Sequence, residues 1–261
     1  MKKMTGLFLA ATLSISMFTG CGNTTTNETT NSQATVAETE SQAAESQAAE
    51  TETMQAETDE NEVAANQLFI DLAGSYQELW PVILDDAYTQ TWVDDCAAIV
   101  GEENAQAAYE KLKSMVTADI YGEEAVKAYQ NGGGAYFCGF TQDVATFEFD
   151  GAAKTIKGYD KDENELFSHT YHYVGMEEVR GLYEFESDDA DAGEFTYFYL
   201  APDTNETTYH IEFRYGKDAD ELATYDAGEY AYWLASGIST EYDEEMIDNC
   251  IQLFCKENLS E

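Results

Sequence analysis

Apolar and polar residues alternate one by one along much of the second half of the chain, a pattern typical of half-buried β-strands. The clearest run places four apolar side chains on one face and four polar ones on the other (Tyr209, Ile211, Phe213 and Tyr215; Thr208, His210, Glu212 and Arg214). Similar runs occupy Ala145–Asp150, Lys154–Tyr159, Leu166–Val174, Val179–Glu186 and Glu194–Leu200. About seven short strands at hairpin spacing predict an antiparallel barrel or sandwich.

Helical segments flank the predicted strands. Gln67–Asp86 reads as a helix interrupted by a Trp-Pro pair, and Glu102–Tyr129 as a helical stretch with a break near Ile120–Gly122. A final helix, capped by Ser239 or Thr240, carries one apolar stripe that is expected to pack on the barrel (Met246, Ile247, Cys250, Ile251 and Phe254). The predicted fold is mainly β with added helices.

The first residues have the pattern of an export signal. Two lysines precede a short apolar run, Leu7–Phe18, which is too short to span a membrane and is typical of a signal peptide over residues 1–20. Gly20 followed by Cys21 resembles the processing site of bacterial lipoproteins, which implies that Cys21 carries a lipid. The alternative is an ordinary cleaved signal with an incidental cysteine. On the lipoprotein hypothesis, the protein is anchored at the cell membrane and faces the extracellular side.

Residues 21–66 are predicted to be a disordered acidic linker. The segment is built from Thr, Asn, Ser, Gln, Ala and Glu without Lys or Arg, and it offers too little apolar surface to offset the entropy of ordering. A helix favoured by its Ala, Glu and Gln content is the alternative. Residues 67–261 then remain for a single packed domain.

The charge of the chain restricts its partners. It has 52 Asp and Glu against 12 Lys and Arg, a net charge of −40. Such a surface repels nucleic acid and anionic lipid, so the only predicted membrane contact is the lipid anchor. It concentrates cations nearby without selecting among them. No serine, cysteine or threonine stands in a nucleophile motif, and we expect no enzymatic activity.

The strand pattern brings few possible metal ligands close to one another. His210 and Glu212 project from the same strand face, about 6–7 Å apart along the strand, although periodicity alone favours a solvated charged face with an incidental histidine. His169 and His172 lie three apart in a predicted strand, so they point to opposite faces and cannot share a metal. The cysteines after Cys21 contain no CxxC pair, and sequence alone does not give their connectivity.

Several segments, in order, resemble the ZinT (YodA) family of exported zinc-binding proteins, which includes the C-terminal domain of AdcA-type zinc lipoproteins. The resemblance covers essentially the whole predicted domain at low identity. It is carried by Leu72–Asp85, Thr117–Asp119, Gly181–Phe185 followed by Asp189–Phe195, His210–Gly216 and, more loosely, Tyr230–Ile251. It implies a lipocalin-like (calycin) antiparallel β-barrel flanked by N- and C-terminal helices, in agreement with the strand pattern.

The resemblance also implies a metal site. The family binds zinc through one loop histidine and an H-x-H pair, and the pair falls on His210 and Glu212 here. The loop histidine falls on Asp203 when residues are counted from Gly193, and on Phe198 when the Ala-Pro dipeptide is aligned. The first register rests on more matching residues, so Asp203, His210 and Glu212 are the predicted ligands. Two carboxylates make the site harder than three histidines would, which admits manganese or calcium besides zinc.

The predicted function is that of an extracytoplasmic lipoprotein that binds a divalent cation, zinc first, as an accessory to metal uptake or buffering. Transfer to a metal-transporter component would need a separate partner protein. The alternative is a calycin-fold module without metal that holds a small apolar or glycan ligand on its many tyrosines and phenylalanines. A purely structural or interaction role at the cell surface is a third hypothesis.

Overall fold

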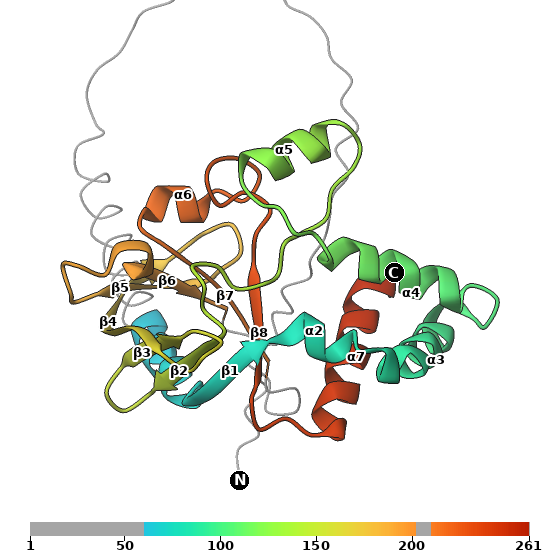
Figure 1. Cartoon of the computed structure of the whole chain (residues 1–261), viewed down its shortest axis with the longest axis horizontal. Coiled ribbons are helices and arrows are strands. Elements are labelled where there is room, and N and C mark those ends of the chain that lie inside the picture. The colour runs from blue at the N-terminus through green and yellow to red at the C-terminus, as the bar shows by residue number, and fades with distance from the viewer. Residues whose placement is uncertain (1–59, 202–209, 261) are drawn as a thin grey trace, which may run out of the picture.

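The computed structural model describes residues 60–201 and 210–260, and within them eight strands form a closed antiparallel β-barrel (Figure 1). Each strand pairs with the next along the chain, and the last pairs with the first. The strands are β1 Gly74–Glu78, β2 Thr146–Asp150, β3 Thr155–Tyr159, β4 Glu165–Met176, β5 Tyr183–Ser187, β6 Tyr197–Leu200, β7 His210–Gly216 and β8 Ala235–Ser239. The barrel with flanking helices confirms the predicted fold class.

The two strands that close the barrel were not predicted. β1 lies inside the segment expected to be a helix, and its sequence, Gly-Ser-Tyr-Gln-Glu, carries a single core side chain, Tyr76. β8 consists of small residues and one isoleucine. Their pairing with each other, through registers such as Tyr76 opposite Ser239, makes them strands. Tertiary contacts therefore override a weak local preference at this seam.

Aromatic rings fill the interior of the barrel. The ring of Phe147 lies 4.9–6.1 Å, centroid to centroid, from five other rings (Phe140, Phe167, Phe198, Phe213 and Tyr215). All of them are buried, and they come from β4, β6, β7 and the segment before β2. Edge-to-face packing of this kind stabilises a core beyond the area that it buries.

The packed part of the chain begins earlier than predicted. Residues 60–71 are helical, and Ala65 and Phe69 are fully buried in the same core as the barrel strands. The Phe69 ring lies 5.1 Å from that of Phe185 and 5.9 Å from that of Phe149. Residues 60–66, assigned to the linker from their composition, thus belong to the fold. Residues 1–59, with the predicted signal peptide, Cys21 and most of the linker, lie outside the described residues.

A group of helices packs beside β1 and β8 (Figure 1). It consists of α2 Leu79–Ile83, the 3₁₀ turn η1 Asp86–Tyr88, α3 Thr89–Val100, α4 Ala105–Val116 and α7 Glu244–Leu259. Ile238, on the outer face of β8, belongs to the core of this group. The break predicted near Ile120–Gly122 separates α4 from α5 Glu123–Gln130, while η2 Gly193–Phe195 and α6 Ala219–Ala223 flank the strands. In the described part of the chain, every helix is too short or too polar to cross a bilayer.

The C-terminal helix is capped differently from the prediction. The side chain of Asp243 accepts a hydrogen bond from the Met246 N–H at 2.9 Å, whereas Ser239 ends β8. Asp243 caps the helix in place of Ser239 because the chain must leave the barrel before it can turn into the helix. The buried face of α7 packs on α3 and α2, in a core that also contains Ile238 of β8.

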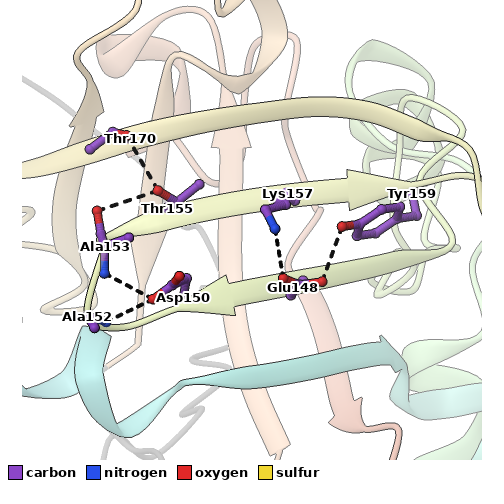
Figure 2. Close-up of polar contacts among 8 residues, drawn as sticks. All are labelled: Glu148, Asp150, Ala152, Ala153, Thr155, Lys157, Tyr159 and Thr170. Carbon is purple, nitrogen blue, oxygen red and sulfur yellow. Dashed lines mark hydrogen bonds and ion pairs between the residues drawn. The ribbon is translucent and has the colours of Figure 1, made fainter.

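The outer face of β2 and β3 is a solvated polar surface. Lys157 Nζ lies 2.9 Å from Glu148 Oε1, and the Tyr159 hydroxyl donates to Glu148 Oε2 at 3.1 Å (Figure 2). The side chains of Lys157 and Glu148 remain 30% and 38% exposed. This face is what the alternating pattern predicts for a strand with one side in the core and one side in water.

Candidate metal site

β7 carries the two predicted ligands that the structure describes. Ile211, Phe213 and Tyr215 point into the barrel, so His210 and Glu212 share the opposite, outer face. Across the pairing with β8, His210 stands opposite Ile238 and Glu212 opposite Ser236. The prediction that these two side chains lie on one strand face is confirmed.

This outer face is not open to solvent. His210 is only 9% exposed, Glu212 is partly buried, and Ser236 is buried beside them. Burial raises the pKa of the neighbouring Cys138 thiol, and the negative charge of Glu212 raises it further. Glu212 therefore lies close to Cys138, whose segment runs along β8 through the hydrogen bond from the Ser236 N–H to the Cys138 carbonyl.

Arg214, the third outward side chain of β7, is fully buried in a network that the sequence did not indicate. Its guanidinium donates to the carbonyls of Leu222 and Tyr230 and lies 4.3 Å from the centroid of the Tyr225 ring. Burial lowers the pKa of Arg214, whereas the nearby Tyr225 opposes that shift. The alternating pattern places Arg214 on the same strand face as Glu212. An arginine on the polar face of a strand in so acidic a chain is the sequence feature that could have indicated the network.

A second arginine completes this network. Arg180 lies 4.4 Å from the centroid of Tyr225, and the Tyr225 hydroxyl donates to Glu177 Oε1 at 3.2 Å. Glu177 is 4% exposed and also accepts backbone hydrogen bonds from Val179 at 2.8 Å and Arg180 at 2.7 Å. Burial, followed by the charge of Glu177, raises the pKa of Tyr225. We call Glu177, Arg180, Arg214 and Tyr225 the arginine–tyrosine network.

The other predicted ligand position depends on which alignment is used. Asp203 lies outside the described residues. Phe198, given by the second alignment, is fully buried in the barrel, 5.3 Å from the Tyr215 ring and 5.2 Å from the Tyr171 ring. Phe198 is therefore a core residue. Within residues 60–201 and 210–260, no three His, Cys, Asp or Glu side chains are grouped so that they could hold a metal ion.

The two other histidines are separate, as predicted. On β4, His169 lies on the inward side with Phe167 and Tyr171, and its Nδ1 is 3.1 Å from Asp189 Oδ2. His172 lies on the outward side, with its Nδ1 2.7 Å from Asp188 Oδ1 and its side chain 51% exposed. Each imidazole therefore has its own carboxylate partner, and they do not share a site.

Comparisons with known proteins give structural neighbours only. No protein-family model matches the sequence, and no curated protein matches it. The fold is similar to the Zn(II)-bound ZinT-like domain of Streptococcus pneumoniae AdcA, at 19% identity, 72% coverage of this chain, 89% of that chain and a TM-score of 0.45. It is also similar to Zn(II)-bound AdcA from the same organism, at 17% identity and a TM-score of 0.42, with 72% of this chain and 35% of that chain covered.

Proposed function

We propose that this protein binds a divalent cation at the outer wall of its barrel, through His210 and Glu212 of β7 with Asp203 as the third ligand. The observation that carries the proposal is the placement of His210 and Glu212 on one strand face that is largely withdrawn from water. An imidazole nitrogen and carboxylate oxygens are ordinary ligands of zinc, and three protein ligands leave one position for water or for a partner's side chain.

Asp203 is the third ligand of this proposal because the resemblance implies it. The Ala201 N–H donates to the Glu212 carbonyl at 2.9 Å, so the described segment 60–201 ends beside Glu212. Asp203 follows Ala201 by two residues in the sequence.

The ligand set and its surroundings bear on which metal binds. Zinc is the proposed metal. The two carboxylate ligands also suit manganese and calcium, which favour oxygen ligands. Arg214 follows Glu212 on the same face, about 6–7 Å along the strand, and its positive charge opposes a bound cation. We therefore expect weaker zinc binding than at a site of three histidines.

The cellular role follows from the sequence features together with this site. The proposal places the protein outside the membrane, attached by a lipid on Cys21, with the acidic chain concentrating cations around it. There it would buffer the metal or pass it to a separate transporter component. No enzymatic activity is part of this role.

The alternative of a small apolar or glycan ligand has less support. The barrel interior, where a calycin-type module would hold an apolar ligand, is filled by the rings around Phe147. Outside the barrel, a hollow of about 330 Å³ lies between α4 and α5, with no aromatic ring in its lining (Ser114, Thr117, Ala118, Asp119, Ile120, Ala125, Ala128, Gly134 and Ala135). Ligand pockets are usually lined by hydrophobic and aromatic side chains.

Calorimetric titration of the metal-stripped protein with zinc, manganese and calcium tests the proposal. We expect one site of micromolar or tighter affinity for zinc, weakened at least tenfold by His210→Ala, Glu212→Ala or Asp203→Ala. Equal affinities in the wild type and these variants would reject the site and assign the binding to surface carboxylates.

Two controls separate the site from the general charge of the chain. His172→Ala removes an exposed imidazole with its own carboxylate partner and should leave the affinity unchanged. Repeating the titration at higher ionic strength should weaken diffuse binding by the surface much more than binding by ligands withdrawn from water.

A further inference from the structure

Two cysteines far apart in the sequence meet between the helices beside the barrel. Cys96 lies on α3 and Cys255 on α7, and their Sγ atoms are 3.7 Å apart. Both residues are fully buried, and α3 and α7 pack directly on each other, with the Trp92 and Phe254 rings 5.9 Å apart edge to face. We propose that Cys96 and Cys255 form a disulfide that ties the C-terminal helix to α3.

The geometry selects this pair among the described cysteines. Cys138 has its sulfur 3.9 Å from the Tyr136 carbonyl, in the segment next to β8. Cys250 is on α7 with Cys255, but five residues turn about 140° around a helix axis, so the two sulfurs leave the helix in different directions. The Cys96 and Cys255 sulfurs are already in contact, and bond formation brings them to about 2.05 Å, a change that side-chain rotation and a slight helix shift supply.

The chemistry is a thiol–disulfide exchange. One thiolate attacks the disulfide of a small molecule or of an oxidoreductase, forming a mixed disulfide, and the second thiolate then displaces the carrier. The two cysteine thiols lose two protons and two electrons in total, and the disulfide that is attacked takes them up and is reduced to two thiols. An exported protein meets such oxidants outside the cytoplasm.

The burial of the pair determines when the bond forms. Desolvation raises the pKa of both thiols in the folded protein, so little of the reactive thiolate is present there. The exchange therefore takes place before α7 has docked on α3. Once the helices have packed, the disulfide is shielded from solvent reductants.

The disulfide is independent of the proposed metal site, because it joins two helices and involves no residue of β7. It closes a loop that contains seven of the eight barrel strands, β2 to β8, since Cys96 precedes β2 and Cys255 follows β8. Cross-links over long loops restrict the unfolded chain most, which stabilises the folded state.

The full chain is unfolded with reductant and then refolded either in a mixture of reduced and oxidised glutathione or in dithiothreitol alone. Proteolysis without reduction, followed by mass spectrometry, is expected to give a linked peptide pair containing Cys96 and Cys255 only after oxidative refolding. The oxidised protein should unfold about 5–15 °C above the reduced one.

Matched variants make this test decisive. Cys138→Ala should keep both the linked peptide and the difference in melting temperature, whereas Cys96→Ala and Cys255→Ala should lose both. Should either variant fail to fold, the linked peptide of the wild type still decides. Free Cys96 and Cys255 after oxidative refolding, or a link from either of them to Cys138 or Cys250, would overturn the proposal.

Discussion

Glu148 and Glu177 make the same kind of contacts in two different environments. Each accepts a hydrogen bond from a tyrosine hydroxyl, from Tyr159 at 3.1 Å and from Tyr225 at 3.2 Å. Glu148 belongs to the solvated face of β2 and β3 and is 38% exposed, whereas Glu177 belongs to the arginine–tyrosine network and is 4% exposed.

The difference shows that an alternating sequence specifies the inner face of a strand but not what covers its outer face. The Thr-Phe-Glu-Phe-Asp sequence of β2 and the His-Ile-Glu-Phe-Arg-Tyr-Gly sequence of β7 have the same period. The polar side chains of β2 meet water, while α6 and the chain leading to β8 cover Arg214 of β7. Polar contacts contribute more to stability where water cannot replace them.

The largest effect on stability is expected from Arg214, one of the two arginines of the arginine–tyrosine network. Arg214→Ala leaves the buried carbonyls of Leu222 and Tyr230 without their donor and opens a cavity beside Tyr225. It should lower the free energy of unfolding by about 3–5 kcal/mol, measured by urea denaturation. Lys157→Ala, its exposed counterpart, should change the urea midpoint little. Similar losses in the two variants would mean that the buried network contributes no more to the free energy of unfolding than the exposed contact of Lys157 does.

A smaller effect is expected from the carboxylates themselves. The Glu177 carboxylate accepts hydrogen bonds from the backbone N–H groups of Val179, Arg180 and Leu182. Glu177→Gln keeps one acceptor oxygen but replaces the other with an amide N–H₂ group, which faces these donors and cannot accept from them. We expect a loss of about 1–3 kcal/mol in the free energy of unfolding. Glu148→Gln is the matched control on the solvated face and should have a much smaller effect in the same urea titration. If the control loses as much stability, burial is not the cause.

Much of the fold could be predicted from the sequence because the strands from β2 to β7 carry the alternating pattern within themselves. β1 and β8 could not, since their sequences acquire a strand preference only when the barrel closes. The same limit applies to residues 60–66, whose composition is that of a linker but whose Ala65 is fully buried in the core. Composition and periodicity predict the local preference of a segment for helix, strand or linker. The structure of segments with a weak preference is determined by long-range contacts.

The candidate site could be predicted in part for the same reason. The period of two places His210 and Glu212 on one face, and the structure confirms this. It does not reveal that the face is covered or that Arg214 is locked in a network beside it, because Glu177, Arg180 and Tyr225 come from other segments. Asp203 remains a prediction from the resemblance.

The smallest expected effect concerns the pH dependence of stability at the edge of the buried network. Burial, followed by the charge of Glu177, raises the pKa of Glu184 on β5 above its ordinary value of 4.5. As the pH rises from about 4.5 through the raised pKa, the folded state holds the Glu184 proton after the unfolded state has lost it. Glu184 therefore makes the free energy of unfolding decline with rising pH over that window.

Glu184→Gln removes this contribution. Urea midpoints measured from pH 4 to pH 7 should show the variant gaining stability relative to the wild type as the pH rises, with a modest amplitude because Glu184 is only partly buried. Glu148→Gln removes one negative charge from the solvated face and controls for the lower net charge. Parallel curves for the wild type and Glu184→Gln, or the same gain in Glu148→Gln, would show that the burial of Glu184 does not cost stability. A gain confined to Glu184→Gln would extend the contrast between the two faces of the barrel to a residue at the border of the network.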